Sequence, residues 1–244
     1  MCNRVDNYGI SIEKVSQQLE AEIAEGNYFF ANEVNAFDRP ALPIVLDHHG
    51  RKITHGTWGL IKEIQKDRPT QGINLTAEKA GTLYREYEHN RCVIPVAGFY
   101  DWMHVSNPGK KTPLKIKHRM HLKGENTFYI AGFYDVWNNN EIGFGVVTTA
   151  ANNLMSVIHN SKSRMPVCLD AEMANRFLNE EPIELFTYPA HDPALVAVNL
   201  EASKMPPTLL GRHSMGKPSA PGATSVASAS LAIKTSPPAK AAWP

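Results

Sequence analysis

The clearest hydrophobic pattern near the start of the chain is that of an amphipathic helix over Ser11 to Glu25. Its apolar residues recur at intervals of three and four and so share one helical face; they are Ile12, Val15, Leu19 and Ile23. Ser11 suits the N-cap, because its hydroxyl accepts a hydrogen bond from a backbone amide of the first turn. Gly26 suits the end, because glycine readily adopts the left-handed conformation that terminates helices.

Most of the remaining apolar residues fall in short β-rich runs separated by turn residues. The predicted strands are Ala41 to Leu46, Cys92 to Val96, Leu114 to Lys117, Phe128 to Phe133 and Gly143 to Thr149, with a turn from Asp47 to Gly50. Three further segments have helical patterns: Thr76 to Glu88, Asn152 to His159 and Ala171 to Asn179. Because strands and helices do not alternate in a βαβ rhythm, we predict an α+β fold of mostly antiparallel β-sheets with a few flanking helices.

The composition changes at about Lys204. Beyond it Ala, Ser, Pro, Gly, Thr and Lys predominate, and such a segment cannot bury enough apolar surface to order itself. We therefore expect one domain over residues 1–203 and a low-complexity, disordered tail over residues 204–244.

Charge and composition narrow the function classes. The formal net charge is +1, so any nucleic-acid site must be a local patch rather than a global basic field. No signal peptide or membrane-spanning run is present, which favours a cytoplasmic protein without a membrane partner. The three cysteines, Cys2, Cys92 and Cys168, lack metal-ligand spacing, and the histidines lack the partners of a zinc site; we expect no metal and no cofactor. Cys92 and Cys168 lie in apolar runs and read as buried small hydrophobes.

Cys2 has a chemistry that no internal cysteine shares. Removal of Met1 would leave a free α-amine beside the thiol, and this pair can capture an aldehyde as an imine that the thiol closes to a thiazolidine ring. A free α-amine titrates at about 7.7–8.0, so a useful fraction is neutral at cellular pH. By position alone, however, the better interpretation of Cys2 is an incidental residue of a frayed terminus.

Four segments are informative about function because of the order in which they occur along the chain. They are Met1-Cys2-Asn3-Arg4, Thr57 to Ile61 followed by Ile73 to Glu78, Arg91 to Trp102, and Ile158 to Val167. Taken singly, Trp58 could be a core residue, Asp101 an ordinary hydrogen-bonded carboxylate and His159 a helix-end histidine. Together the segments resemble, from Met1 to about Asn199, the SOS-response-associated peptidase (SRAP) family of abasic-site processing proteins.

The resemblance implies a barrel-like SRAP fold and a function in the DNA damage response. Family members bind single-stranded DNA that carries an abasic site and bond its aldehyde to the N-terminal cysteine, giving a covalent crosslink. Some also show lyase behaviour and reverse the crosslink. For this chain it implies a monomer of bacterial or phage type whose partner is single-stranded DNA with abasic sites, associated with the nucleoid when bound.

The resemblance also assigns roles to residues. Cys2 would be the nucleophile, Asn74 would orient the terminus or the sugar, Asp101 would give and take protons during imine formation, and His159 would protonate the sugar ring oxygen. For DNA, Arg4 and Arg164 would reach phosphates, Trp58 would stack on a base, and Met165 and Pro166 would wedge beside the lesion.

The chain departs from the family pattern at several of these positions. Asn3 replaces glycine, Asp101 replaces a longer glutamate, and Leu75-Thr76 replaces Ala-Arg, which removes one expected phosphate contact. Lys62 stands where a proline is usual, and the spacing from His159 to Arg164 is longer than in the short form of the motif. Two alternatives stay open. One is an autoproteolytic thiol peptidase that uses Cys2 with His159. The other is a single-stranded-DNA-binding module with impaired catalysis, for which Asn3 and Asp101 would be the evidence.

Overall fold

The computed structural model describes residues 2–47, 50–61, 72–137 and 140–204. Met1, Lys62, part of the predicted 47–50 turn and the tail beyond residue 204 lie outside the described residues. No helix in the described ranges is long and apolar enough to cross a membrane.

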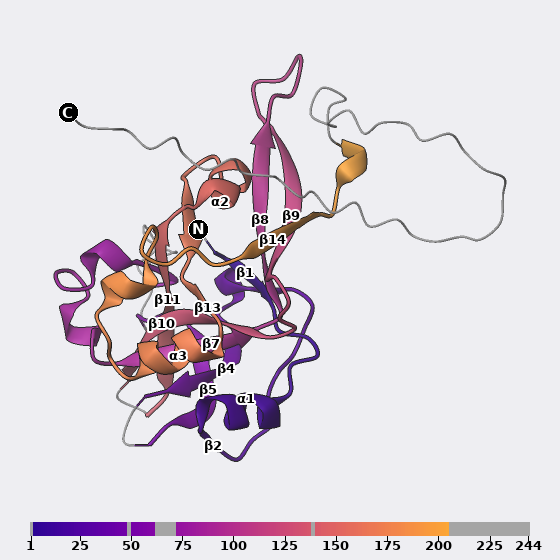
Figure 1. The fold of residues 1–244 in the computed structure, drawn as a ribbon. Helices are drawn as coiled ribbons and strands as arrows, with labels where there is room; N and C mark the ends of the chain where they lie inside the picture. Colours follow the sequence, from indigo (N-terminus) through magenta and orange to yellow (C-terminus); the bar gives the residue numbers. More distant parts are fainter. Residues whose placement is uncertain (1, 48–49, 62–71, 138–139, 205–244) are drawn as a thin grey trace, which may run out of the picture.

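Two β-sheets and three short α-helices make up the fold (Figure 1). The strands are β1 Arg4–Asp6, β2 Glu22–Ile23, β3 Val34–Asn35, β4 Ala41–Leu46, β5 Lys52–Trp58, β6 Asn74–Thr76, β7 Arg91–Val96, β8 Gly98–Val105, β9 Leu114–Leu122, β10 Phe128–Val136, β11 Ile142–Ala150, β12 Arg164–Pro166, β13 Cys168–Leu169 and β14 Leu195–Asn199. The α-helices are α1 Ile12–Leu19, α2 Asn153–Ile158 and α3 Ala171–Leu178. Short 3₁₀ turns are η1 Ala36–Asp38, η2 Ala77–Lys79, η3 Arg85–Tyr87, η4 Ile183–Phe186 and η5 Ala202–Lys204.

The larger sheet closes into a five-stranded barrel. Strands run in the order β12-β11-β10-β7-β4-β5-β2, and β11 also pairs with β5. This parallel pairing sets Gly143 opposite Thr57 and Phe144 opposite Trp58, which joins the two ends of the β5-β4-β7-β10-β11 path. Closure removes the open sheet edges that these strands would otherwise expose. The predicted α+β fold, with mostly antiparallel sheet and a barrel, is confirmed.

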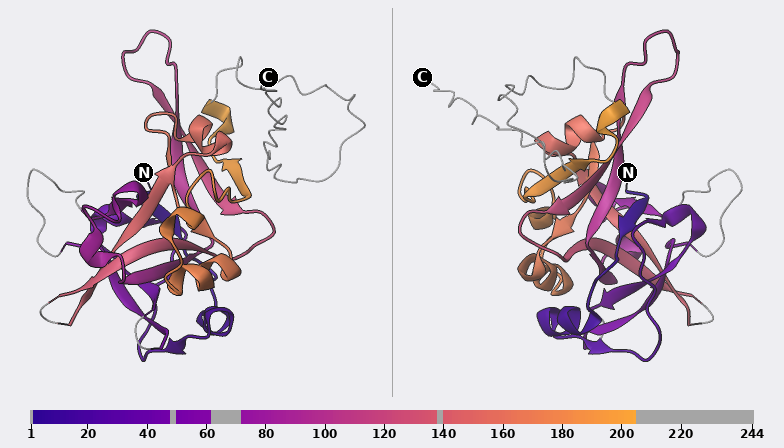
Figure 2. Two further views of the ribbon diagram at one scale, coloured as in Figure 1. Left: turned by 60° about the vertical axis from the view of Figure 1, so that its left-hand side comes forward. Right: turned by 90° about the vertical axis from the view of Figure 1, so that its right-hand side faces the viewer.

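The smaller sheet has the order β14-β9-β8-β1-β3. Its β8–β9 hairpin extends well beyond the body of the molecule in every view, whereas α1 and β2 lie at the opposite end (Figures 1 and 2). The helix α2 packs beside β8. This sheet therefore brings the N-terminal strand, the Asp101 strand and the residues after α2 into one region.

Two of the predicted helices were wrong in extent. The first ends at Leu19, because Glu20 adopts a left-handed φ of 52° and its amide bonds Ser16 O; Glu22 and Ile23 then pair with β5 as a strand. The segment Thr76 to Glu88 is not one helix: Thr76 belongs to β6, which pairs with β11, and only η2 and η3 follow. In both segments sheet pairing with a distant strand outweighs local helix propensity.

Candidate active site

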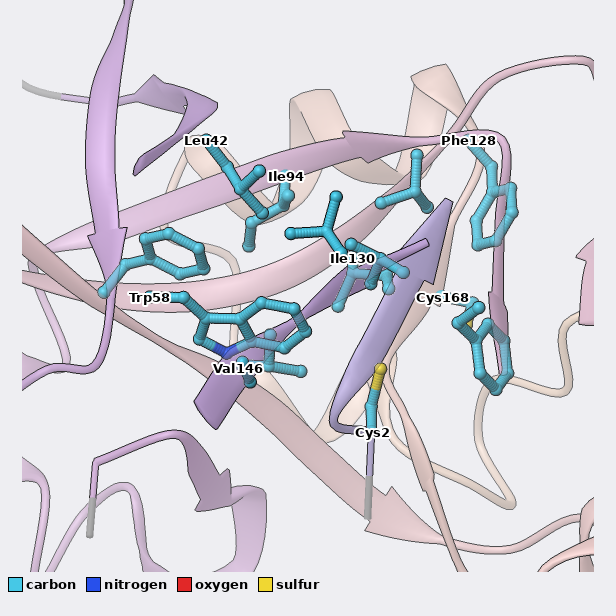
Figure 3. Close-up of a cluster of buried hydrophobic side chains, with 14 of the residues drawn as sticks. Cys2, Leu42, Trp58, Ile94, Phe128, Ile130, Val146 and Cys168 are labelled. Atoms are coloured by element: carbon cyan, nitrogen blue, oxygen red, sulfur yellow. The ribbon is translucent and has the colours of Figure 1, made fainter. Parts of the chain in front are cut away.

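Cys2 lies directly before β1 and is fully buried, with 0% of its surface exposed. Its Sγ points into the apolar cluster that also holds Cys168 and Phe128 (Figure 3). The thiol donates a long hydrogen bond to Arg4 O, at 4.0 Å. Burial, with a smaller contribution from Asp101, raises the pKa of the Cys2 thiol to about 12, so the sulfur is a neutral thiol at cellular pH. Cys92 and Cys168 are buried and free as predicted.

Asn74 lies next to the N-terminal segment. It occupies the first position of β6, which runs parallel to β11, and its Nδ2 donates to Asn3 Oδ1 at 2.9 Å. Its own Oδ1 is buried without a hydrogen-bond partner among the described residues. A buried acceptor in this state is costly, and a donor from the N-terminus or from a bound sugar would satisfy it. Asn3, the departure from glycine, thus provides the contact that holds Asn74.

Asp101 and His159 form a buried pair although 58 positions separate them in the sequence. Asp101 lies on the same, core-facing side of β8 as Phe99 and Met103, which are two residues before and after it. His159 is the C-cap of α2. Asp101 Oδ2 lies 3.5 Å from His159 Nδ1, and the residues are 7% and 5% exposed. Trp102 N–H donates to Asp101 Oδ1 at 2.8 Å. The shorter aspartate therefore still reaches the histidine.

Burial shifts the pKa values of Asp101 and His159 in opposite directions. Desolvation raises the pKa of the Asp101 carboxyl, and the neighbouring His159 opposes that shift. Desolvation lowers the pKa of His159, which Asp101 and the carbonyl of Arg164 partly restore. His159 Nδ1 lies 2.7 Å from Arg164 O; since that oxygen can only accept, Nδ1 carries a proton and Nε2 is the nitrogen that titrates. Opposite shifts of this kind are characteristic of acid–base groups at functional sites.

Asn160 links the segment that carries His159 to the strand that carries Asp101. Its Oδ1 accepts from His104 N–H at 3.1 Å and its Nδ2 donates to His104 O at 2.8 Å. These two bonds tie the segment after α2 to β8, the strand that carries Asp101. Asn160 directly follows His159 in the motif, but its residue type alone does not indicate this positioning role.

A pocket of about 460 Å³ opens beside the pair. It is lined by Asn3, Arg4, Phe37, Asp101, Trp102, His104, Lys115, His159, Ser161 and Lys162. Arg4 is held by Glu33 at 2.7 Å, and its guanidinium lies 5.6 Å from the ring centre of Trp102. The side chains of Lys115 and Lys162 have no carboxylate partner among the described residues. The longer His159-to-Arg164 spacing thus brings a lysine to the pocket of a chain that lacks the arginine expected at Thr76.

Trp58 does not present a stacking face. It is 0% exposed, its Nε1–H donates to Ile73 O at 3.1 Å, and its ring stacks on Phe144 at 6.1 Å between centres. The expectation that it stacks on a base is wrong for this conformation, because both faces of the indole are covered inside the barrel. The aromatic residues that line the pocket are Trp102, which is half-buried, and Phe37, which is exposed.

The motif that contains Arg164 is also more internal than expected. Met165 is 1% exposed and Pro166 is buried in β12, so neither projects as a wedge. Arg164 donates to both carboxylate oxygens of Glu78 at 2.9 Å and to Thr148 O at 2.6 Å. Its charge is therefore already paired, and its carbonyl orients His159. Within the described ranges, no group of three or more His, Cys, Asp or Glu residues is placed to hold a metal ion.

Comparison with known proteins gives consistent results. A family model described as "SOS response associated peptidase (SRAP)" matches residues 1–201. The chain is 31% identical over 190 residues to the abasic site processing protein YoqW of Bacillus subtilis, which covers 73% of this chain and 80% of that protein. It is 30% identical over 190 residues to YobE of the same species, also an abasic site processing protein, covering 73% and 82%.

Solved structures support the fold. A protein from Bacteroides thetaiotaomicron superposes with a TM-score of 0.68 at 23% identity, covering 87% of this chain and 100% of that one. A protein from Bordetella bronchiseptica superposes with a TM-score of 0.62 at 18% identity, covering 82% and 99%.

Proposed function

The chain belongs to the SOS response associated peptidase (SRAP) family, and from that membership and the site geometry we propose that it processes abasic sites in single-stranded DNA. The reaction is covalent capture of the sugar aldehyde by Cys2 after removal of Met1. The relatives' names support abasic-site processing as the task. The observation that carries the chemistry is the buried Asp101–His159 pair at a pocket lined by Asn3, the neighbour of Cys2.

Ring opening is the first step. The abasic sugar is mostly a closed hemiacetal. As the ring opens, its ring oxygen must gain a proton while the anomeric hydroxyl loses its own to solvent, which leaves the aldehyde. His159 lines the pocket and has a pKa lowered by burial, so its protonated form readily gives up the proton. Arg164 O fixes the Nδ1–H tautomer, which makes Nε2 the donor.

Imine formation follows at the α-amine of Cys2. The nitrogen attacks the aldehyde carbon, and the resulting carbinolamine loses water to give a protonated imine, whose nitrogen keeps its one remaining hydrogen. Asp101, whose pKa is raised by burial, protonates the departing hydroxyl and becomes a carboxylate. The buried Asn74 Oδ1 accepts from the amine and holds its lone pair toward the carbon.

Ring closure completes the crosslink. The Cys2 sulfur adds to the imine carbon, its proton passes to the Asp101 carboxylate, and a thiazolidine forms; the net reaction is aldehyde plus aminothiol giving thiazolidine plus water. The thiol's raised pKa favours attack by the amine before the sulfur. Burial of the sulfur also shields the product from water, and the same groups acting in reverse account for crosslink reversal. Lyase behaviour starts instead from the protonated imine: a base removes the C2′ proton and the 3′-phosphate leaves.

DNA binding uses the pocket rim. Trp102 offers a partly exposed ring for stacking, a contact worth about 1–3 kcal/mol per base. Lys162 and Lys115, and Arg4 once it is released from Glu33, are placed for phosphates. A monomer suffices, because one chain supplies every group in this scheme, and DNA binding would place the protein at the nucleoid.

The decisive experiment is a crosslinking assay. The purified protein, with its N-terminus mapped by mass spectrometry, is incubated with single-stranded DNA that bears one abasic site and then run under denaturing conditions. We expect a heat-resistant shifted band that disappears in Cys2→Ala. Native binding without that band would refute catalysis and leave a DNA-binding module.

The thiol peptidase alternative has less support. A peptidase needs a thiolate activated by a neighbouring base, whereas burial raises the pKa of the Cys2 thiol to about 12 and the thiol donates to the carbonyl oxygen of Arg4. Cys2-dependent peptide cleavage without any DNA crosslink would favour the peptidase instead.

A further inference from the structure

The charge of the chain is strongly segregated. Residues 102–124 contain six Lys and Arg residues and no Asp or Glu. The rest of the chain then holds 19 Lys and Arg against 24 Asp and Glu, so a protein of net charge +1 carries a local charge of +6 within 23 consecutive residues. This is the local basic patch that a near-neutral nucleic-acid binder requires.

This basic segment is the β8–β9 hairpin and the turn after it. The hairpin projects beyond the body of the molecule in all views (Figures 1 and 2). Lys110 and Lys111 are exposed at its tip, where Lys110 N–H donates to Asn107 O at 3.0 Å. Along the hairpin a small apolar cluster of Met103, Val105 and Ile116, with Leu114 packed against it, stiffens the two strands.

The inner cations of the hairpin are neutralised and the outer ones are not. Lys117 pairs with Glu33, and Arg119 pairs with Asp6 at 2.8 Å. Lys110, Lys111 and Lys115 have no carboxylate within ion-pairing distance among the described residues. A charge without a carboxylate partner attracts a phosphate without first breaking an ion pair, so the outer half is the part able to bind a polyanion.

The outer half is continuous with the pocket. Lys115 faces His104 across the β8–β9 pair, and both line the pocket that contains Asp101 and His159. Since a strand rises about 3.3 Å per residue, Lys111 lies roughly 13 Å or less beyond Lys115. Positive charge therefore leads from the catalytic pair to the tip.

We propose that the outer β8–β9 hairpin is a DNA-binding arm. On this proposal, which rests on the proposed function, Lys110, Lys111 and Lys115 bind the phosphate backbone of the single strand as it leaves the pocket. The contacts are independent of base sequence, and they extend the footprint beyond the nucleotides next to the lesion.

The test compares K110Q/K111Q with K14Q/K52Q. Each variant removes two exposed lysines; Lys14 and Lys52 lie in α1 and β5, away from the hairpin. The probe is fluorescent single-stranded DNA with a reduced abasic site, which has no aldehyde and cannot crosslink. Affinity is measured across a salt series with oligonucleotides of about 4 and about 16 nucleotides, which span the range of single-strand site sizes.

With the long oligonucleotide, the negative slope of log K against log salt should become shallower in K110Q/K111Q by about 1.4. This corresponds to roughly 25-fold weaker binding at about 0.1 M salt, because each phosphate contact to a single strand contributes about 0.7. The control and the short oligonucleotide should show no change. An unchanged slope overturns the arm, and so does an equal loss with the short oligonucleotide, which would place these lysines in the pocket.

Crosslinking to aldehyde-bearing DNA separates this proposal from the previous one. Cys2-dependent crosslinking with an unchanged salt slope would reject the arm and keep the function. A reduced slope without Cys2-dependent crosslinking would keep the arm as a DNA contact and reject the function.

Discussion

Replacing Asp101 by asparagine tests the buried pair directly. The two side chains have nearly the same shape, so the substitution removes a charge and a proton-transfer group without opening a cavity. At 3.5 Å between Asp101 Oδ2 and His159 Nδ1, an effective dielectric constant of about 20 gives an attraction of about 5 kcal/mol for the ionised pair. Protonated His159 loses this attraction in Asp101→Asn.

We expect crosslinking to slow by about 10² to 10⁴, the usual contribution of general acid–base catalysis. DNA affinity should be unchanged. Because Asp101 raises the pKa of His159, the limb of the pH–rate profile on which the rate falls with rising pH should move to lower pH. The assay is single-turnover crosslinking at saturating DNA over a pH series.

Although Asp101→Asn should slow crosslinking, it should not lower the stability of the fold. The folded-state pKa of Asp101 is raised by burial, so the stability it contributes is present at low pH and is lost as pH rises through that pKa. Above that pKa the buried, ionised carboxylate destabilises the fold, so Asp101→Asn should there melt at the same temperature as the wild type or higher. Asp135→Asn, a carboxylate with a raised pKa outside the pocket, is the control. A crosslinking rate within threefold of wild type, or an equal loss in the control, would refute the role of the pair.

Three further substitutions probe the surrounding structure. Trp58→Phe should cost about 1–3 kcal/mol in urea unfolding, because it removes the bond to Ile73 O, which keeps only the bond from Val146 N–H, and leaves a void where the larger, fully buried indole packed. Weaker DNA binding at unchanged stability would instead place Trp58 on the DNA. Asn160→Ala should slow crosslinking by up to about 10² through misplacement of His159, with DNA affinity retained, and an unaltered rate would show that its two bonds to His104 are dispensable. His118 is buried with a lowered pKa, so its contribution is present above about pH 6.5 and lost on acidification; His118→Gln should lose less melting temperature than wild type between about pH 7 and pH 5, and parallel melting curves would contradict this.

The apolar pattern along the chain predicted those helices and strands whose burial in the fold follows their own periodicity. The strand Ala41–Leu46 and the helix Ala171–Leu178 lie where the sequence places them, to within one residue. The order of the motifs identified the family. Cys2, Asn74, Asp101 and His159 were candidates from residue type and order alone, and the structure brings Asp101 and His159 together and sets Asn74 against the residue next to Cys2.

The sequence could not determine which side chains are buried or already paired with another protein group, and so cannot contact DNA. Trp58 and Arg164 have the residue types that bind DNA, yet barrel closure buries the indole and Glu78 pairs with the guanidinium. Lys110 and Lys111 resemble any exposed lysines until the hairpin is seen to project from the pocket with its inner cations neutralised. Residue type and periodicity are local properties of a chain, whereas burial and ion pairing depend on neighbours that only the tertiary fold supplies, and those neighbours decide which groups can reach DNA.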